Sequence, residues 1–186
     1  MSRPAAFLDR DGTVIEEVNY LTRVEQLRLE PGAANAMRRL RGAGYLLILI
    51  TNQSGVARGM LTEEDLAGIH RRLSEMLSAE GADLDGAYYC PHLPGAEVGE
   101  YDLECACRKP KPGMIHKAAE EHGIDLAASV MFGDSERDVE AGKVAGCRAA
   151  LIHHGDAPDE TRADYSAKDL SEAVDALLAG RLEVRP

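Results

Sequence analysis

Short apolar runs alternate along the chain with segments whose apolar residues recur at helical spacing. The segment 45–50 is apolar at every position, which is typical of a central parallel strand covered on both faces. The pattern predicts strands at Ala5–Leu8, Tyr45–Ile50, Gly86–Tyr89, Val130–Phe132 and Ala149–Ile152, and helices at Ala33–Arg41, Glu63–Ala79, Met114–His122, Arg137–Val144 and Ser171–Leu178. We therefore expect an α/β fold with a doubly wound, Rossmann-like parallel sheet of about five strands.

Local signals support the predicted boundaries. Thr62 and Asp65 form a capping signature for the helix that follows them, and glycines stand where four helices should stop, at Gly42, Gly81, Gly123 and Gly146. Without repeats, low-complexity tracts or linkers, residues 1–186 read as a single domain. Two stretches, 16–30 and 91–112, lack regular patterns, and long irregular loops in a compact domain are usually functional.

The first predicted strand runs directly into Asp9-Arg10-Asp11-Gly12-Thr13. Side chains two positions apart in an extended segment point the same way, and chemistry in open α/β sheets collects at the carboxyl ends of strands. Asp9 and Asp11 therefore suit a nucleophile beside a proton donor, or a divalent-metal site. An Asp-Gly turn that closes a hairpin is the simpler alternative.

Two other strand ends carry polar groups. Thr51, Asn52, Gln53 and Ser54 follow the second strand, where hydroxyl and amide groups suit an anionic oxygen but also make ordinary turns. Asp134 follows the fourth strand, and a third carboxylate there indicates a Mg²⁺ site, although capping of the next helix by Asp134 and Ser135 is the alternative.

A basic segment interrupts an acidic chain at Arg108-Lys109-Pro110-Lys111-Pro112. The prolines restrict its backbone, so that a cation held on the catalytic face could stabilise charge on a transferring phosphoryl group. A solvated basic loop is the alternative.

Three cysteines and a histidine cluster in the sequence between residues 90 and 107. Cys90, His92, Cys105 and Cys107 supply four zinc-type ligands in two short groups, which predicts a closed, tetrahedral and therefore structural Zn²⁺ site. A reducing cytosolic setting favours metal binding over disulfides for such a cluster.

The net charge of −11 disfavours a nucleic-acid partner, because phosphate backbones are bound by basic surfaces. No segment is apolar for the roughly 18 residues that a membrane span requires, and the N-terminus leaves no room for a signal peptide before the first strand. We expect a cytoplasmic protein and, without an evident self-complementary patch, a monomer.

Taken together, these motifs resemble the haloacid dehalogenase superfamily of phosphohydrolases. The matching elements appear in the family's order: Asp9-x-Asp11-Gly12-Thr13, Thr51, Lys109 and Gly133-Asp134-x-x-x-Asp138. The resemblance implies that Asp9 attacks phosphorus to form an aspartyl-phosphate, and that Asp11 acts first as general acid and then as general base. It also implies that Thr51 and Lys109 hold the phosphoryl oxygens, and that Mg²⁺ is bound by Asp9, the backbone carbonyl of Asp11, and Asp134.

The cysteine loop narrows the resemblance to the D-glycero-D-manno-heptose 1,7-bisphosphate 7-phosphatases. Histidinol-phosphate phosphatases share the cysteine–histidine arrangement, but the twelve residues between His92 and Cys105 resemble the longer spacer of the heptose group. The resemblance implies a small phosphorylated sugar as substrate, with Arg108 in its recognition and a pocket lined by Asn19, Tyr20, Asn52, Gln53 and Ser54. The insertions are too short for a separate cap domain.

One residue departs from that group, since Ser135 stands where the heptose enzymes carry a lysine near the substrate. Arg10, Arg58 and Lys111 are the candidates to replace the missing cation. Two non-enzyme classes fit less well. A receiver domain places its acceptor aspartate after an internal strand and has no zinc loop, and a zinc-ribbon nucleic-acid binder requires a basic surface.

Overall fold

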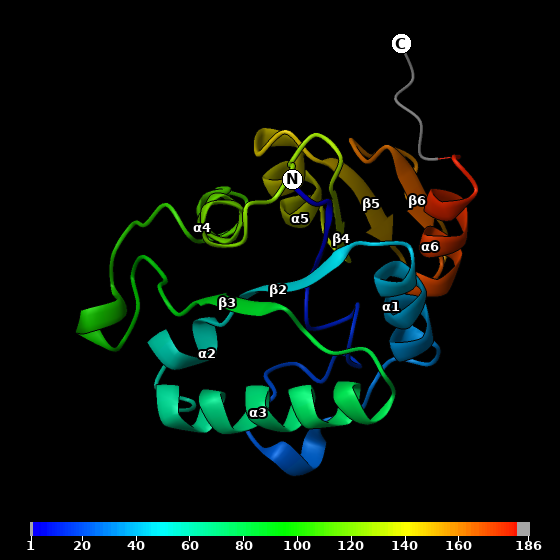
Figure 1. The fold of residues 1–186 in the computed structure, drawn as a ribbon. Coiled ribbons are helices and arrows are strands. Elements are labelled where there is room, and N and C mark those ends of the chain that lie inside the picture. Colours follow the sequence, from blue (N-terminus) through cyan, green and yellow to red (C-terminus); the bar gives the residue numbers. More distant parts are fainter. Residues whose placement is uncertain (1, 182–186) are drawn as a thin grey trace.

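A computed structural model describes residues 2–181, so both ends of the predicted domain, residue 1 and residues 182–186, lie outside the described residues. The described chain forms one parallel sheet in the order β3-β2-β1-β4-β5-β6 (Figure 1). Its strands are β1 (Ala5–Leu8), β2 (Leu46–Asn52), β3 (Gly86–Cys90), β4 (Val130–Gly133), β5 (Arg148–Ile152) and β6 (Tyr165–Ala167). The doubly wound fold is confirmed.

The sheet has six strands, whereas the sequence predicts about five. The additional strand, β6, is only three residues long and has no apolar run that would distinguish it from a loop. It forms because its backbone pairs with β5 at the sheet edge, from Ala150 with Tyr165 to Ile152 with Ala167. Such a strand depends on tertiary pairing more than on local sequence pattern.

All five predicted helices are present. The helices are α1 (Ala33–Gly42), α2 (Ser54–Ala57), α3 (Glu63–Ala79), α4 (Gly113–His122), α5 (Glu136–Val144) and α6 (Leu170–Leu178), with single 3₁₀ turns at Val24–Gln26 and Gly99–Tyr101. Thr62 caps α3 as predicted: its hydroxyl accepts from the Asp65 amide, and the Asp65 carboxylate accepts from the Thr62 amide. The short α2 was not predicted.

Helices cover both faces of the sheet. The helices α1, α3 and α6 cover one face, and α4 and α5 cover the other (Figure 1). The side chains of β1 alternate between the two cores, with Leu8 in the first and Phe7 in the second. Both residues are fully buried. No helix in the described part of the chain is long and apolar enough to cross a membrane.

The strand order changes direction at β1, which has β2 on one side and β4 on the other. In open α/β sheets, ligands bind at this switch point, outside the carboxyl ends of the strands. The strand β2 extends beyond its predicted end at residue 50, because Thr51 and Asn52 still pair with β3. The two irregular segments, 16–30 and 91–112, follow β1 and β3, at the same edge of the sheet.

Candidate active site

A cavity of about 330 Å³ lies at the carboxyl ends of the central strands. It brings together residues that are far apart in the sequence and come from the loops after β1, β2, β3 and β4. Every residue predicted for catalysis, for magnesium or for substrate binding lines it: Asp9, Asp11, Asn19, Tyr20, Thr51, Asn52, Gln53, Ser54, Arg108, Lys109 and Asp134. Their individual roles remain predictions.

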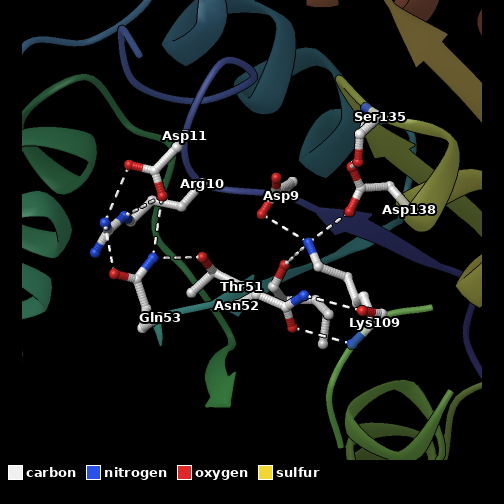
Figure 2. A network of polar contacts seen from close by, with 10 residues as sticks. Asp9, Arg10, Asp11, Thr51, Asn52, Gln53, Lys109, Ser135 and Asp138 are labelled. Carbon is white, nitrogen blue, oxygen red and sulfur yellow. Dashed lines mark hydrogen bonds and ion pairs between the residues drawn. The ribbon is translucent and has the colours of Figure 1, made fainter. Parts of the chain in front are cut away.

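Lys109 lines the cavity, and its side chain is only 3% exposed. Its Nζ lies 2.7 Å from Asp9 Oδ1 and 2.6 Å from Asp138 Oδ1, and it donates to the Ile50 carbonyl at 2.9 Å (Figure 2). Burial disfavours its charged form, but the two carboxylates outweigh burial and raise the pKa of Lys109 above its usual value. The solvated-loop alternative for Lys109 is therefore wrong.

Asn52 holds the backbone of Lys109 in place. The Asn52 Nδ2 group donates to the Lys109 carbonyl, and the Lys109 amide donates to Asn52 Oδ1, both at 3.0 Å. The following peptide bond, Lys109–Pro110, is cis. Asn52 thus acts on the cavity by fixing the loop that carries Lys109.

Three carboxylates gather on the β1–β4 side of the cavity. Oxygens of Asp9, Asp134 and Asp138 lie within 4.8 Å of one another, and the Lys109 ammonium group pairs with two of them, Asp9 and Asp138, so acidic groups outnumber cations in this cluster. Burial raises the pKa of Asp9 to about 7, although Lys109 opposes this. Burial and then the charge of Asp138 raise the pKa of Asp134 to about 6. A hard divalent cation with oxygen ligands fits this donor set and its excess charge.

Gly12 allows Asp134 to approach the loop after β1. A Cβ atom at Gly12 would lie 2.3 Å from Asp134 Oδ2 and 2.9 Å from its Cγ, and the φ angle of Gly12 is +70°. The imidazole of His154, which follows β5, lies with Nε2 2.7 Å from the Gly12 carbonyl oxygen. A side chain at position 12 would therefore displace the Asp134 carboxylate.

The Asp11 carboxylate faces a different set of partners from Asp9. Arg10 Nε donates to Asp11 Oδ2 at 3.1 Å, and Arg10 Nη2 donates to Asp11 Oδ1 at 3.0 Å (Figure 2). Gln53 Nε2 donates to Asp11 Oδ2 at 3.0 Å and to Thr51 Oγ1 at 2.8 Å. Gln53 thus connects the proposed proton donor to the proposed phosphoryl-binding hydroxyl.

The strand geometry assumed for Asp9 and Asp11 holds only as far as Leu8, where β1 ends. Beyond it the chain turns, and the Gly12 amide donates to the Ile15 carbonyl at 2.8 Å. The carboxylates of Asp9 and Asp11 therefore lie in one cavity without sharing a partner. The Asp11 carboxylate is not part of the acidic cluster, and its implied contribution to a metal site, the backbone carbonyl, remains a prediction.

Ser135, which stands where the heptose enzymes carry a lysine, is the N-cap residue of α5. Its hydroxyl donates to Asp138 Oδ2 at 2.7 Å, and its amide donates to the same oxygen at 3.1 Å. This orients Asp138 toward Lys109, so the Asp138 carboxylate, which sequence reasoning placed only loosely, is a central member of the site. The capping alternative, which named Asp134 and Ser135, holds for Ser135, which forms a capping box with Asp138.

Of the three candidates to replace the missing cation, only Arg10 lines the cavity, and its guanidinium group is already paired. Arg10 is buried against Asp11 and Gln53, Arg58 lies 5.8 Å from the ring centroid of Tyr20, and Lys111 is exposed with Nζ 3.7 Å from Glu104. Arg58 and Lys111 do not line the cavity, whereas Arg137 does. Sequence reasoning missed Arg137, although its position two residues after Ser135, on the first turn of α5, was a usable signal.

The cysteine cluster lies beside the cavity and not in it. The Sγ atoms of Cys90, Cys105 and Cys107 are 3.2–3.5 Å apart, and His92 Nδ1 is 3.4 Å from Cys107 Sγ and 3.6 Å from Cys90 Sγ. Four ligands around a tetrahedral Zn²⁺ with Zn–S distances of about 2.3 Å place their sulfurs roughly 3.8 Å apart. The four cysteines of the chain are free thiols, so the predicted set is assembled as a metal site would require.

Arg108 connects the cysteine cluster to the cavity. Arg108, one residue after Cys107, donates from Nη1 to the His92 carbonyl at 3.1 Å and lines the cavity wall. A closed metal site at these residues would hold Arg108 in position without taking part in the chemistry.

Comparisons with known proteins agree with this geometry. A family model described as HAD-hydrolase-like matches residues 106–175. The chain is 42% identical to the D-glycero-D-manno-heptose-1,7-bisphosphate 7-phosphatase of Thermosynechococcus vestitus, over 94% of this chain and 95% of the relative. It is 40% identical to the D-glycero-beta-D-manno-heptose-1,7-bisphosphate 7-phosphatase of Yersinia pestis, over 96% of this chain and 97% of the relative.

A solved structure is similar over the same extent. The D,D-heptose 1,7-bisphosphate phosphatase of B. bronchiseptica, crystallised with magnesium and phosphate, has a TM-score of 0.80 and 34% sequence identity and covers 95% of this chain and 99% of its own. The fold, the cavity residues and near-complete coverage by these relatives lead to one conclusion. The chain belongs to the D-glycero-D-manno-heptose-1,7-bisphosphate 7-phosphatase family of the haloacid dehalogenase superfamily.

Proposed function

We propose that this protein is a Mg²⁺-dependent phosphomonoesterase that removes the 7-phosphate of D-glycero-D-manno-heptose 1,7-bisphosphate through an aspartyl-phosphate intermediate. The observation that carries this proposal is the placement of Asp9 in a polar cavity, 2.7 Å from a buried lysine and beside two further carboxylates. A nucleophilic carboxylate can approach a phosphate only where cations offset their mutual repulsion.

In the first step, a carboxylate oxygen of Asp9 forms a bond to phosphorus as the bond from phosphorus to the sugar oxygen breaks. The Lys109 ammonium group and the Thr51 hydroxyl stabilise the phosphoryl oxygens. Mg²⁺ held by Asp9, Asp134 and the backbone carbonyl of Asp11 would supply the remaining positive charge. Asp138 holds Lys109 beside the nucleophile throughout.

Asp11 acts as the general acid in the first step and as the general base in the second. Its carboxylic acid form gives a proton to the departing sugar oxygen, and the resulting carboxylate then takes a proton from the water that attacks the aspartyl-phosphate. This attack breaks the bond between Asp9 and phosphorus, releases inorganic phosphate and restores both carboxyl groups. The hydrogen bonds from Arg10 and Gln53 fix the orientation that both transfers require.

The cavity also has cations for a second phosphate. In addition to the Asp9–Lys109 pair, Arg108 lines it from the loop after β3, and Arg137 lines it from α5. A bisphosphate would place its reacting phosphate at Asp9 and its other phosphate at these guanidinium groups. Cys90, His92, Cys105 and Cys107 would hold a structural Zn²⁺ that keeps Arg108 on the cavity wall.

Phosphate release from both anomers of the heptose bisphosphate and from histidinol phosphate, with kcat/KM compared in the presence of Mg²⁺, tests this proposal. We expect the β anomer to be the best substrate, since the relative from Yersinia pestis is named for it. Asp9→Asn, which removes the nucleophile, serves as the negative control. A preference for histidinol phosphate would refute the proposed substrate while leaving the chemistry intact.

A further inference from the structure

His70 lies behind the active site on α3, outside the cavity wall. Its Nε2 atom is 3.3 Å from Arg10 Nη1, and its ring meets the Tyr89 ring edge-on, with 5.7 Å between centroids. The proposed mechanism gives His70 no role. Its contact with Arg10 nevertheless connects α3 to the residue that holds the proposed proton donor.

Arg10 is a buried cation that needs an acceptor for each of its nitrogens. Its side chain is only 1% exposed, so water cannot replace a missing partner. Nε and Nη2 are used by Asp11, and Nη2 also donates to Gln53 Oε1 at 2.9 Å. The remaining nitrogen, Nη1, faces His70. His70 therefore completes the set of acceptors that fixes the guanidinium plane.

The charge state of His70 makes it a suitable partner. Burial and the neighbouring Arg10 charge lower the pKa of His70 to about 4, against a smaller opposing effect of Asp11. With Tyr89 as its other ring neighbour, the imidazole is neutral at neutral pH, and its Nε2 can accept from Arg10. Because the His70 imidazole is uncharged, it orients the Arg10 guanidinium group without weakening the ion pair between Arg10 and Asp11.

We propose that His70 is a positioning residue that acts through Arg10: it fixes the guanidinium group whose two parallel hydrogen bonds hold the Asp11 carboxyl group in place for proton transfer. The proposal rests on the proposed phosphomonoesterase activity. It assigns a function to α3, which contributes no residue of its own to the proposed chemistry. It predicts that a change on this helix alters the proton-transfer step selectively.

The test uses leaving groups that differ in their need for a proton. Phenyl phosphate releases a basic phenolate that requires protonation, whereas 2,4-dinitrophenyl phosphate releases a stable anion that does not. Single-turnover release of the phenol, with Mg²⁺ present and enzyme in excess, reports only the step in which the aspartyl-phosphate forms. Three variants are compared with the unaltered protein: His70→Leu removes the acceptor, His70→Gln keeps a neutral acceptor, and Ser74→Ala is an exposed control on the same helix.

We expect His70→Leu to slow the phenyl phosphate reaction by about 10-fold or more and the dinitrophenyl reaction by less than about 2-fold, because general acid catalysis is worth about 10²–10⁴-fold when the leaving group needs it. His70→Gln should recover most of the loss. Equal slowing of both esters, or no slowing of either, would overturn the proposal. Failure of the unaltered protein to release phosphate from the heptose bisphosphate would instead refute the proposed activity.

A spectroscopic measurement tests the same contact without catalysis. In ¹⁵N NMR spectra of the imidazole, His70 should remain neutral with Nε2 unprotonated throughout the neutral range, since Nε2 accepts from Arg10. The opposite tautomer, or titration near the usual histidine value, would overturn the proposal even if the protein proved inactive toward aryl phosphates.

Discussion

Gly12→Ala should both strain the backbone and displace a ligand of the proposed metal site. An alanine Cβ would lie 2.3 Å from Asp134 Oδ2, against an ordinary contact distance of 3.4 Å or more. The Asp134 carboxylate must therefore move by about 1 Å. The backbone offers little relief, because the φ angle is +70° and His154 lies against the Gly12 carbonyl.

Two losses are expected from this substitution. Strain from a left-handed L-residue costs about 1–2 kcal/mol, and each kcal/mol lowers Tm by about 2–4 °C in a chain of this size. A displacement of about 1 Å at a reacting centre costs about 100-fold in rate. Because Asp134 is a proposed magnesium ligand, the loss should be accompanied by a higher Mg²⁺ concentration for half-maximal activity.

Gly123→Ala provides the matched control. Gly123 has a similar φ angle of +62° after α4, and a methyl group added at that position would meet no atom within 4 Å beyond its own chain neighbours. This variant should lose similar stability while keeping its activity and its Mg²⁺ dependence. Thermal unfolding and Mg²⁺ titrations of phosphatase activity measure both effects. Equal kcat and equal Mg²⁺ dependence in the two variants would refute the placement of Asp134 at the metal.

Three further predictions concern the buried charges and the cysteine cluster. Asp138→Asn should cost about 1.5–3 kcal/mol in unfolding free energy, measured by urea denaturation, because Lys109 loses a charged partner. Inductively coupled plasma mass spectrometry should find about one zinc per chain, and Cys107→Ser should lower both the zinc content and Tm. Without Mg²⁺, stability should fall as pH rises from about 4 to about 7, because the raised pKa values of Asp9 and Asp134 mean that the folded state binds more protons than the unfolded state. Added Mg²⁺ should therefore raise Tm more above pH 7 than near pH 4, which calorimetry can measure.

Each of these predictions has a result that contradicts it. Unchanged stability in Asp138→Asn would mean that the ion pair with Lys109 contributes nothing in solution. A folded protein free of zinc would remove the proposed role of the cysteine cluster. A Mg²⁺-induced rise in Tm that is independent of pH would show that protons and the metal ion do not compete for the Asp9 and Asp134 carboxylates.

Local sequence patterns predicted the parts of the fold that local physics determines. The apolar segment Ala5–Leu8 forms β1 at its predicted bounds. Thr62 caps α3 through contacts with Asp65, which is only three residues further along the chain. The cysteine cluster was equally accessible, because its four ligands lie in two short groups on one loop. By contrast, β6 depends on pairing with β5, which its three residues do not encode.

The polar partners within the site could not be predicted because they depend on tertiary approach. Arg10 looked like a free cation in the sequence, but the turn after Leu8 buries it against Asp11 and Gln53. Lys109 was expected on a loop near the reaction, whereas its position between Asp9 and Asp138 follows only from the folded sheet. Strand ends could be located from the pattern, but not which side chains pair there.

Trapping the phosphorylated intermediate tests the central claim most directly. Asp11→Asn should form the aspartyl-phosphate from 2,4-dinitrophenyl phosphate, which needs no general acid, and then hydrolyse it slowly because no base activates water. After acid quenching and proteolysis, mass spectrometry should find one phosphoryl group on the peptide that contains Asp9, and none when Asp9→Asn is added to the same variant. A phosphoryl group on another residue, or release of dinitrophenolate without any phosphorylated peptide, would contradict the assignment of Asp9 as the nucleophile.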